Sequence, residues 1–312
     1  MFVWVVIISD MGMRNNFKLL VALLFVLAFC SNELLAQRWN RYRKEFSFSV
    51  GASNMLSDLG GGPGDGSRFG DFQFPTSSYV VGVSWKYRIH NHMALKANIL
   101  FTELKGDDKA SKNLGRKIRN LDVKTSLIEF SGQYEFYLLR ERIGSRYKLK
   151  KVKGYGSSNF SLYLFAGLGG AYYTPQGTNK KGDYVGLADL NTEGQGLKGA
   201  PKDYNQLTFV FPVGLGLKYN ITHLVGVQFE YGMRFTTTDY LDDVSTTYFD
   251  GDALENAFGV VSKEMADKRY NKSGRHSEGG IRGNSRKNDF YMFGLLSLTY
   301  RWKSRAKSRV RL

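Results

Sequence analysis

Strict alternation of apolar and polar residues recurs in eight segments of this 312-residue chain and is the feature that most restricts its fold. In YVVGVSWKYRIHNHMALKANILF, residues 79–101, Tyr79 and Trp85 fall on one side of an extended chain, whereas Lys86 falls on the other. A period of two residues is that of a β-strand. The tight connection at 90–92, after which the alternation resumes, indicates a hairpin.

The eight segments share an apolar row that often begins or ends in Tyr, Trp or Phe, the aromatic-girdle pattern of transmembrane barrels. They cover residues 46–52, 79–89, 93–101, 128–138, 160–172, 207–219, 225–235 and 290–302. Their opposite rows carry Lys86, Arg88, Lys96, Glu129, Gln133, Glu135, Lys218, Gln228, Glu230, Arg234 and Arg301. Opposite charges can pair in the filled lumen of a small barrel, so we expect the apolar rows to face outward.

The predicted fold class is all-β: an eight-stranded antiparallel up-and-down transmembrane β-barrel with long extracellular loops. The alternative is a soluble barrel of lipocalin type with the apolar rows inside. Strand lengths of about nine to thirteen residues favour the transmembrane barrel, since they suit a tilted span of the bilayer.

Connection lengths predict the topology of the barrel. The long connections are 54–77, 105–121, 174–206 and 236–288, and the tight ones are 90–92 and 220–223. In such barrels long loops face outside and short turns face the periplasm. The exception is 139–159, which is long but falls on the turn side. Pro212 interrupts the sixth segment, and its missing N–H predicts a bulge there.

The N-terminus predicts export. A basic stretch at 13–18 precedes the apolar run 19–29, and a small residue, Ala36, precedes Gln37 at an acceptable cleavage site. We expect residues 1–36 to be a signal peptide, in which 1–12 is an over-extended start. We expect the mature protein to lie in a Gram-negative outer membrane. A membrane anchor and lipidation at Cys30 are weaker alternatives, because the apolar run is short and Phe29 is a poor residue before a lipidation cysteine. We divide the rest into a periplasmic segment 37–45, the barrel 46–302 and a basic periplasmic tail 303–312.

Most of the net charge of +16 is expected on the periplasmic side. There the segments 37–45, 139–159 and 301–312 are rich in Lys and Arg, and only Glu45 and Glu141 oppose them. Such a surface favours an anionic partner. The residues that we predict to bind it are Arg140, Arg142, Arg146, Lys148, Lys150, Lys151, Lys153, Lys303, Arg305, Lys307, Arg309 and Arg311.

Catalytic and metal-binding signals are weak, and we expect neither an enzyme nor a cofactor or metal. His90, His92 and His223 lie beside tight turns and read better as interfacial residues than as a metal cluster. A loop-borne hydrolase would need His276 near Asp242 or Asp243, and nothing in the sequence brings them together. The acidic stretch 238–250 lacks the spacing of a calcium loop and reads as a hydrogen-bonded cap. The glycines of 60–66 lack the context of a phosphate loop.

Five stretches resemble the PorG-like outer-membrane barrels of Bacteroidota. They are SNMLSDLGG (53–61), LNTEGQGL (190–197), FPVGLGLKYN (211–220), TDYLDDVSTTYFD (238–250) and FYMFGLLSLTYRW (290–302), and the resemblance spans 46–302. It implies an OmpA-type eight-stranded barrel that belongs to the type IX protein secretion system. The family motif loops contribute Thr192, Glu193, Gly194, Gln195, Gly196, Asp239, Tyr240, Leu241, Asp242, Asp243 and Ser245.

The resemblance also implies a partner: a periplasmic ring built by a lipoprotein and a soluble protein. Our leading hypothesis is a monomeric, non-enzymatic barrel, surrounded by outer-membrane lipid, that docks this ring through its basic periplasmic face. Nucleic acid is not expected as a partner, because an exported barrel rarely meets it. The alternatives are an OmpA-like structural barrel without a role in secretion and the loop-borne hydrolase.

Overall fold

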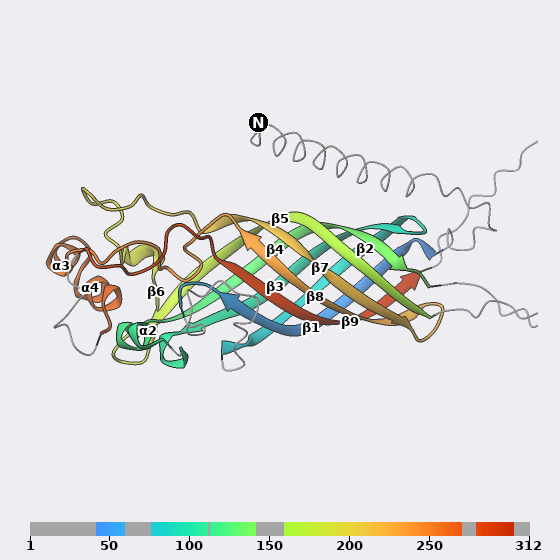
Figure 1. Ribbon diagram of the computed structural model, residues 1–312, viewed down its shortest axis with the longest axis horizontal. Coiled ribbons are helices and arrows are strands. Elements are labelled where there is room, and N and C mark those ends of the chain that lie inside the picture. The colour runs from blue at the N-terminus through green and yellow to red at the C-terminus, as the bar shows by residue number, and fades with distance from the viewer. Residues whose placement is uncertain (1–41, 60–75, 112, 142–158, 270–278, 303–312) are drawn as a thin grey trace, which may run out of the picture. The chain divides into compact units, whose positions relative to one another are not determined.

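The computed structural model describes residues 42–59, 76–111, 113–141, 159–269 and 279–302. Eight antiparallel strands form a closed barrel, in which each strand pairs with the next and β9 pairs with β1 (Figure 1). The strands are β1 (Lys44–Leu56), β2 (Ser78–His90), β3 (Met93–Asp107), β4 (Asp122–Leu139), β5 (Phe160–Thr178), β7 (Leu207–Asn220), β8 (Val225–Thr236) and β9 (Phe290–Trp302). All eight strands predicted from the alternation are therefore confirmed. The signal peptide and most of the segment 37–45 lie outside the described residues.

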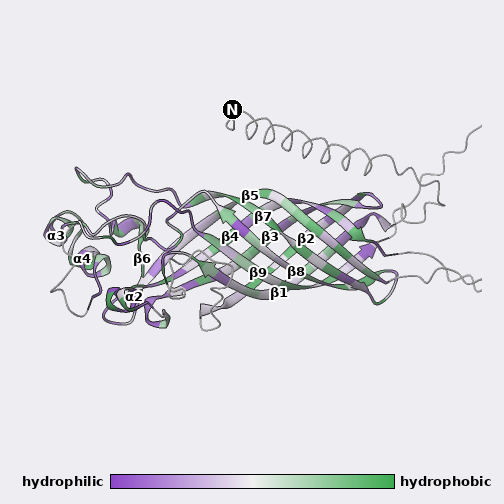
Figure 2. Ribbon diagram, viewed as in Figure 1, coloured by the Kyte–Doolittle hydropathy of each residue, from purple (hydrophilic) through white to green (hydrophobic). Residues whose placement is uncertain are grey.

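The apolar rows face outward, as predicted. Phe130, Leu168 and Phe209 are 62%, 68% and 69% exposed, whereas Glu129 and Ser131, the neighbours of Phe130 in the chain, are fully buried. Figure 2 shows hydrophobic residues along the barrel strands and mostly hydrophilic ones around α2 (Leu114–Arg119). A charged interior inside an apolar exterior is the inverse of a soluble barrel. The fold is therefore that of a transmembrane β-barrel.

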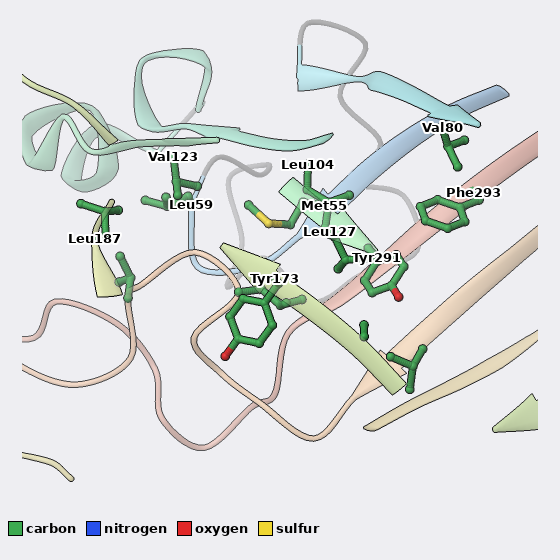
Figure 3. Close-up of a cluster of buried hydrophobic side chains, with 14 of the residues drawn as sticks. Met55, Leu59, Val80, Leu104, Val123, Leu127, Tyr173, Leu187, Tyr291 and Phe293 are labelled. Carbon is green, nitrogen blue, oxygen red and sulfur yellow. The ribbon is translucent and has the colours of Figure 1, made fainter. Parts of the chain in front are cut away.

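An apolar cluster closes the barrel interior near the end that carries the long loops (Figure 3). Leu104, Leu127 and Phe293 project inward from the strands, and Leu187 and Leu241 pack onto them from the loops. The sequence predicts a lumen filled by paired charges, whereas apolar side chains fill this part of the barrel. The reason is that loop residues, whose apolar character follows no period, fold back onto the ends of the strands.

The four connections named above as long lie at one end of the barrel, as predicted. The tight turns 90–92 and 220–223 lie at the other end, where the longer connection between β4 and β5 also begins and ends. The loops contain the 3-10 helices η3 (Asp108–Ala110) and η4 (Ala188–Leu190), the helices α2, α3 (Gly251–Phe258) and α4 (Val260–Ala266), and the strand β6 (Tyr184–Gly186), which pairs with β5. Local capping starts the helices. The Asn113 side chain accepts a hydrogen bond from the N–H of Gly115 at α2, and Asp250 accepts one from that of Asp252 at α3.

The bulge predicted at Pro212 is wrong. The register of β7 with both neighbours stays unshifted through this residue. Instead, the pairing with β5 skips the two positions between Val210 and Val213, where proline has no N–H to donate. The irregularities of register lie elsewhere, between Arg88 and His90 and between Tyr137 and Leu139.

Candidate functional site

Five charged side chains fill the barrel interior next to the turn end. Arg301 Nε lies 2.8 Å from Glu45 Oε2, Lys218 contacts the same carboxylate, and Arg88 Nη2 lies 2.8 Å from Glu141 Oε1. Arg301 also bridges to Glu141 at 2.5 Å. The assignment of Glu45 and Glu141 to the periplasmic surface is therefore wrong. Arg301, predicted both as an inward residue and as part of the segment 301–312, is an inward residue. The alternation of Ser47 and Ser49, continued back to Glu45, does predict that the Glu45 side chain points inward. Glu141 lies after a register shift and beyond the end of β4, where the alternation gives no prediction.

A second ionic layer lies deeper in the barrel. Lys86 Nζ lies 2.9 Å from Glu135 Oε2, and Lys96 Nζ lies 2.6 Å from Glu230 Oε2. The Tyr163 hydroxyl donates a hydrogen bond of 2.7 Å to Glu230. Lys86 and Lys96 stand directly opposite each other on β2 and β3, so these carboxylates are needed to offset the repulsion between them.

A third layer leads to the apolar cluster. Glu129 accepts a hydrogen bond of 2.8 Å from the Tyr291 hydroxyl and lies 3.6 Å from Arg234 Nε. The guanidinium of Arg234 also lies over the Phe293 ring, 4.3 Å from its centroid. All eleven inward polar residues named from the alternation are buried. Together the three layers and the apolar cluster fill the barrel with side chains, as expected for eight strands.

The described residues that flank the predicted basic segments lie at the turn end of the barrel. There β1 begins and β9 ends, since Lys44 is paired with Trp302, and β4 ends beside the start of β5, where Leu139 is paired with Leu162. Among the predicted partner-binding residues, only Arg140 lies in a described segment, and it is partly exposed. The others lie outside the described residues: Arg142, Arg146, Lys148, Lys150, Lys151, Lys153, Lys303, Arg305, Lys307, Arg309 and Arg311.

The opposite end carries a buried polar cluster, to which the loops at 190–197 and 238–250 contribute. Glu193, fully buried, receives a hydrogen bond of 2.8 Å from Arg282 Nη1 and one of 2.9 Å from the N–H of Ser245. Thr246 donates to the same carboxylate from its N–H at 3.1 Å and from its hydroxyl at 2.6 Å. One carboxylate thus joins residues that are up to 89 positions apart.

Asp243 occupies the centre of this cluster in the left-handed region, with φ of 61°. It accepts hydrogen bonds of 2.5 Å from the Thr192 hydroxyl and 2.6 Å from the Tyr204 hydroxyl. The Tyr204 ring stacks on that of Tyr240 at 4.4 Å. The sequence prediction of a hydrogen-bonded cap at 238–250 therefore agrees with the structure, which adds the contacts with 192–204. We call this cluster and the loops that it joins the cap.

A second arginine ties two further loops to the cap. Arg119 donates to both oxygens of Asp108 at 2.7 Å, to the carbonyl of Asp58 at 2.7 Å and to that of Arg282 at 2.5 Å. Sequence reasoning missed Arg119, Arg282 and Asp58, because these residues lie in long loops where no period marks a side chain as buried.

Burial perturbs the carboxylates of the cap. It raises the pKa of Asp239 to about 8, and the nearby Asp242 carboxylate adds to this effect. Burial raises the pKa of Asp242 to about 7, with a further contribution from Asp58, and that of Asp243 to about 6, although Arg282 lies beside it. The pKa of Asp289 is also raised, first by burial and then by Asp242 and Asp239. The cap therefore holds acids that readily take up protons.

The cap offers no catalytic pair among the described residues. His90, His92 and His223 lie at the turn end of the barrel, away from Asp242 and Asp243, and His276 lies outside the described segments. His92 is engaged with the Tyr137 carbonyl at 2.9 Å. In the part of the chain that is described, no group of three or more His, Cys, Asp or Glu side chains could hold a metal ion. Within the same residues, no helix is long and apolar enough to cross a membrane.

Comparisons with known proteins give similar solved structures only. No family model matches the chain, and no curated protein matches it. The chain is similar to Ail, the attachment invasion locus protein of Yersinia pestis, solved with the heparin analogue sucrose octasulfate: identity is 10%, TM-score 0.35, and 83% of this chain and 99% of Ail are covered. For Neisserial surface protein A the identity is 13%, the TM-score 0.36 and the coverage 83% and 96%. For the outer membrane protein OprG of Pseudomonas aeruginosa these values are 10%, 0.31, 85% and 98%.

Proposed function

We propose that this protein is a non-enzymatic outer-membrane barrel that docks a periplasmic assembly of a protein secretion machine through its basic periplasmic face. The filled interior supports a scaffold role, because ionic layers and an apolar cluster occupy the path that a solute would take. The family resemblance supplies the partner: the ring of a lipoprotein and a soluble protein in type IX secretion.

One observation carries this proposal. The chain ends from which 37–43, 142–158 and 303–312 continue all belong to the turn end of the barrel. The acids nearest to them, Glu45 and Glu141, are buried and already paired with Arg88, Lys218 and Arg301. These two carboxylates are therefore not available to neutralise the Lys and Arg residues of the three segments. A dense positive surface attracts an acidic partner at long range.

The test compares two charge-matched variants of the full chain. The first changes Arg146, Lys148, Lys150, Lys151 and Lys153 to Gln. The control changes five basic residues of the extracellular loops to Gln: Lys117, Lys181, Lys198, Lys202 and Arg286. Each form is purified from outer membranes in mild detergent, and the proteins that accompany it are identified.

We expect wild type and the control to bring down periplasmic proteins that the first variant loses, while all three forms insert as folded barrels. A barrel that comes down alone in every form contradicts a docking role and favours the OmpA-like structural barrel. Loss of binding to anionic lipid vesicles in the first variant, with no protein partner for wild type, identifies the inner leaflet as the partner instead.

A further inference from the structure

A cleft of about 1090 Å³ lies on the outer side of the barrel at its loop end, above the lipid-facing residues. Its walls come from β3, β4, the end of β5, β6 and α4, which Figure 1 shows around the loop end of the barrel. This volume is sufficient for a sugar-phosphate head group. Seven lysine and arginine side chains line the cleft.

Most charged groups of the cleft are already paired. Lys268 binds Asp122 at 2.7 Å, and Lys124 binds Glu103 at 2.5 Å. Lys263 and Arg269 also form ion pairs, with Glu255 and Asp267. The ion pair of Lys180 with Glu264 is long, at 4.0 Å, and the Lys180 side chain is 84% exposed.

Two exposed lysines of the lining, Lys105 and Lys109, have no carboxylate partner among the described residues. Lys105 also stands directly opposite Lys124 on the neighbouring strand, and among the described residues the nearby carboxylate of Glu103 is paired with Lys124 rather than with Lys105. Two carboxylates lie between Lys105 and Lys109 in the chain: Asp108 is paired with Arg119, and Asp107 accepts a hydrogen bond of 2.8 Å from the N–H of Lys109. The unpaired groups of the cleft therefore have a cationic excess.

The strand register places these lysines relative to the membrane. Phe101, Ile128 and Tyr172 form one outward row across β3, β4 and β5, and each is exposed. Lys105 and Lys124 form an outward pair four residues further along the same strands. Four residues of strand rise about 13 Å, or about 10 Å along the membrane normal at a tilt of about 40°. The lysine pair therefore lies just above the aromatic belt, at the level of the outer-leaflet head groups.

We infer that this cleft binds the phosphorylated head group of an outer-leaflet glycolipid through Lys105 and Lys109. The acyl chains of such a lipid would lie along the row of Phe101, Ile128 and Tyr172. A phosphate ester fits better than a neutral sugar, because the unpaired groups of the cleft are mainly ammonium groups, which form charge-assisted hydrogen bonds with phosphate oxygens. The inference depends only on the transmembrane barrel and is independent of the periplasmic partner.

The test is lipid binding by native mass spectrometry of the full-length protein in detergent. The probes are bisphosphorylated lipid A, the same lipid after removal of its phosphates, and inorganic phosphate. The variant Lys105→Gln/Lys109→Gln breaks no ion pair that holds the cap together. Its matched control, Lys198→Gln/Lys202→Gln, removes two exposed extracellular charges away from the cleft.

We expect wild type and the control to prefer the phosphorylated lipid, and the cleft variant to bind it roughly 30-fold more weakly, for two lysines at about 1 kcal/mol each. A shift in the electrophoretic mobility of the unheated protein shows that each form is folded. Equal affinity of the variant and the control overturns the inference, as does equal binding of the dephosphorylated lipid or no lipid binding by wild type. Competition by inorganic phosphate as strong as that by the lipid would reassign the cleft to free phosphate.

Discussion

Neutralising Glu193 should open the cap without unfolding the barrel. The substitution Glu193→Gln keeps the shape of the side chain but removes the charge that faces Arg282, whose side chain is only 2% exposed. Breaking a buried ion pair by removing one partner costs about 3–5 kcal/mol. Because Asp243 remains 3.6 Å from Arg282 Nη2, we expect a cost of about 3 kcal/mol, at the lower end of that range.

Hydrogen exchange measured by mass spectrometry tests this prediction on the folded protein in detergent. The N–H groups of Ser245 and Thr246 donate to Glu193, so the peptide that contains them reports on the opening of the cap. A cost of about 3 kcal/mol corresponds to a loss of protection of roughly 150-fold in this peptide. Peptides from the barrel strands should keep their protection.

The double variant Glu193→Gln/Arg282→Met should recover part of the lost protection, because it removes both charges of the Glu193–Arg282 pair. Asp243 loses the same guanidinium, which lowers its pKa, and should then be protonated more readily. The control is Glu255→Gln, which removes a partly exposed carboxylate from Lys263 and should change exchange in this peptide little. Unchanged protection in Glu193→Gln, or a double variant that is worse than both single ones, would refute the reasoning. Equal loss of protection in cap and barrel would show that the cap does not open separately.

Two further predictions concern the cap and the outer surface. The folded-state pKa values of Asp239, Asp242 and Asp243, about 8, 7 and 6, lie above the ordinary 3.8, so the closed cap binds protons more tightly than the open one. Its stability should therefore be greatest near pH 4 and decrease as the pH rises towards 8, and Asp239→Asn should reduce this dependence, as measured by exchange corrected for its intrinsic pH effect. On the outer surface, Val213→Arg, near the middle of the span, should cost about 2–4 kcal/mol in urea unfolding from lipid vesicles, whereas Tyr219→Arg, near its edge, should cost about 1 kcal/mol or less. Equal costs at the two positions would contradict the assigned membrane depth.

The strands, their direction and the outward face of the apolar rows could be predicted from the sequence. The signal is local: Phe130 between Glu129 and Ser131 identifies an outward position without knowledge of any partner strand. The lengths of the connections, which are also read locally, predict which end of the barrel carries the loops and which carries the tight turns. Alternation therefore determines both the fold class and the identity of the residues that line the lumen.

The partners of those residues could not be predicted from the sequence. Lys86 and Lys96 are close to each other in the hairpin, but Glu230, which binds Lys96, is 134 positions away and comes next to it only when the sheet closes. The misassignment of Glu45 and Glu141 has the same origin. Both lie at strand ends, where the charge of the neighbouring sequence suggests a surface and only barrel closure places them among Arg88, Lys218 and Arg301.

The cap and the cleft depend still more on tertiary structure. The resemblance identified the two motif loops from the sequence. It did not show that Glu193 would form an ion pair with Arg282, which lies in a third stretch of the chain. Nor does any pattern in the loops show that Lys105 lies opposite Lys124 beside α4. The physical reason is that a strand repeats every two residues, so that a short window reveals which face each residue occupies. Loop residues have no such period, and their burial, charge state and partners are decided by contacts between distant segments.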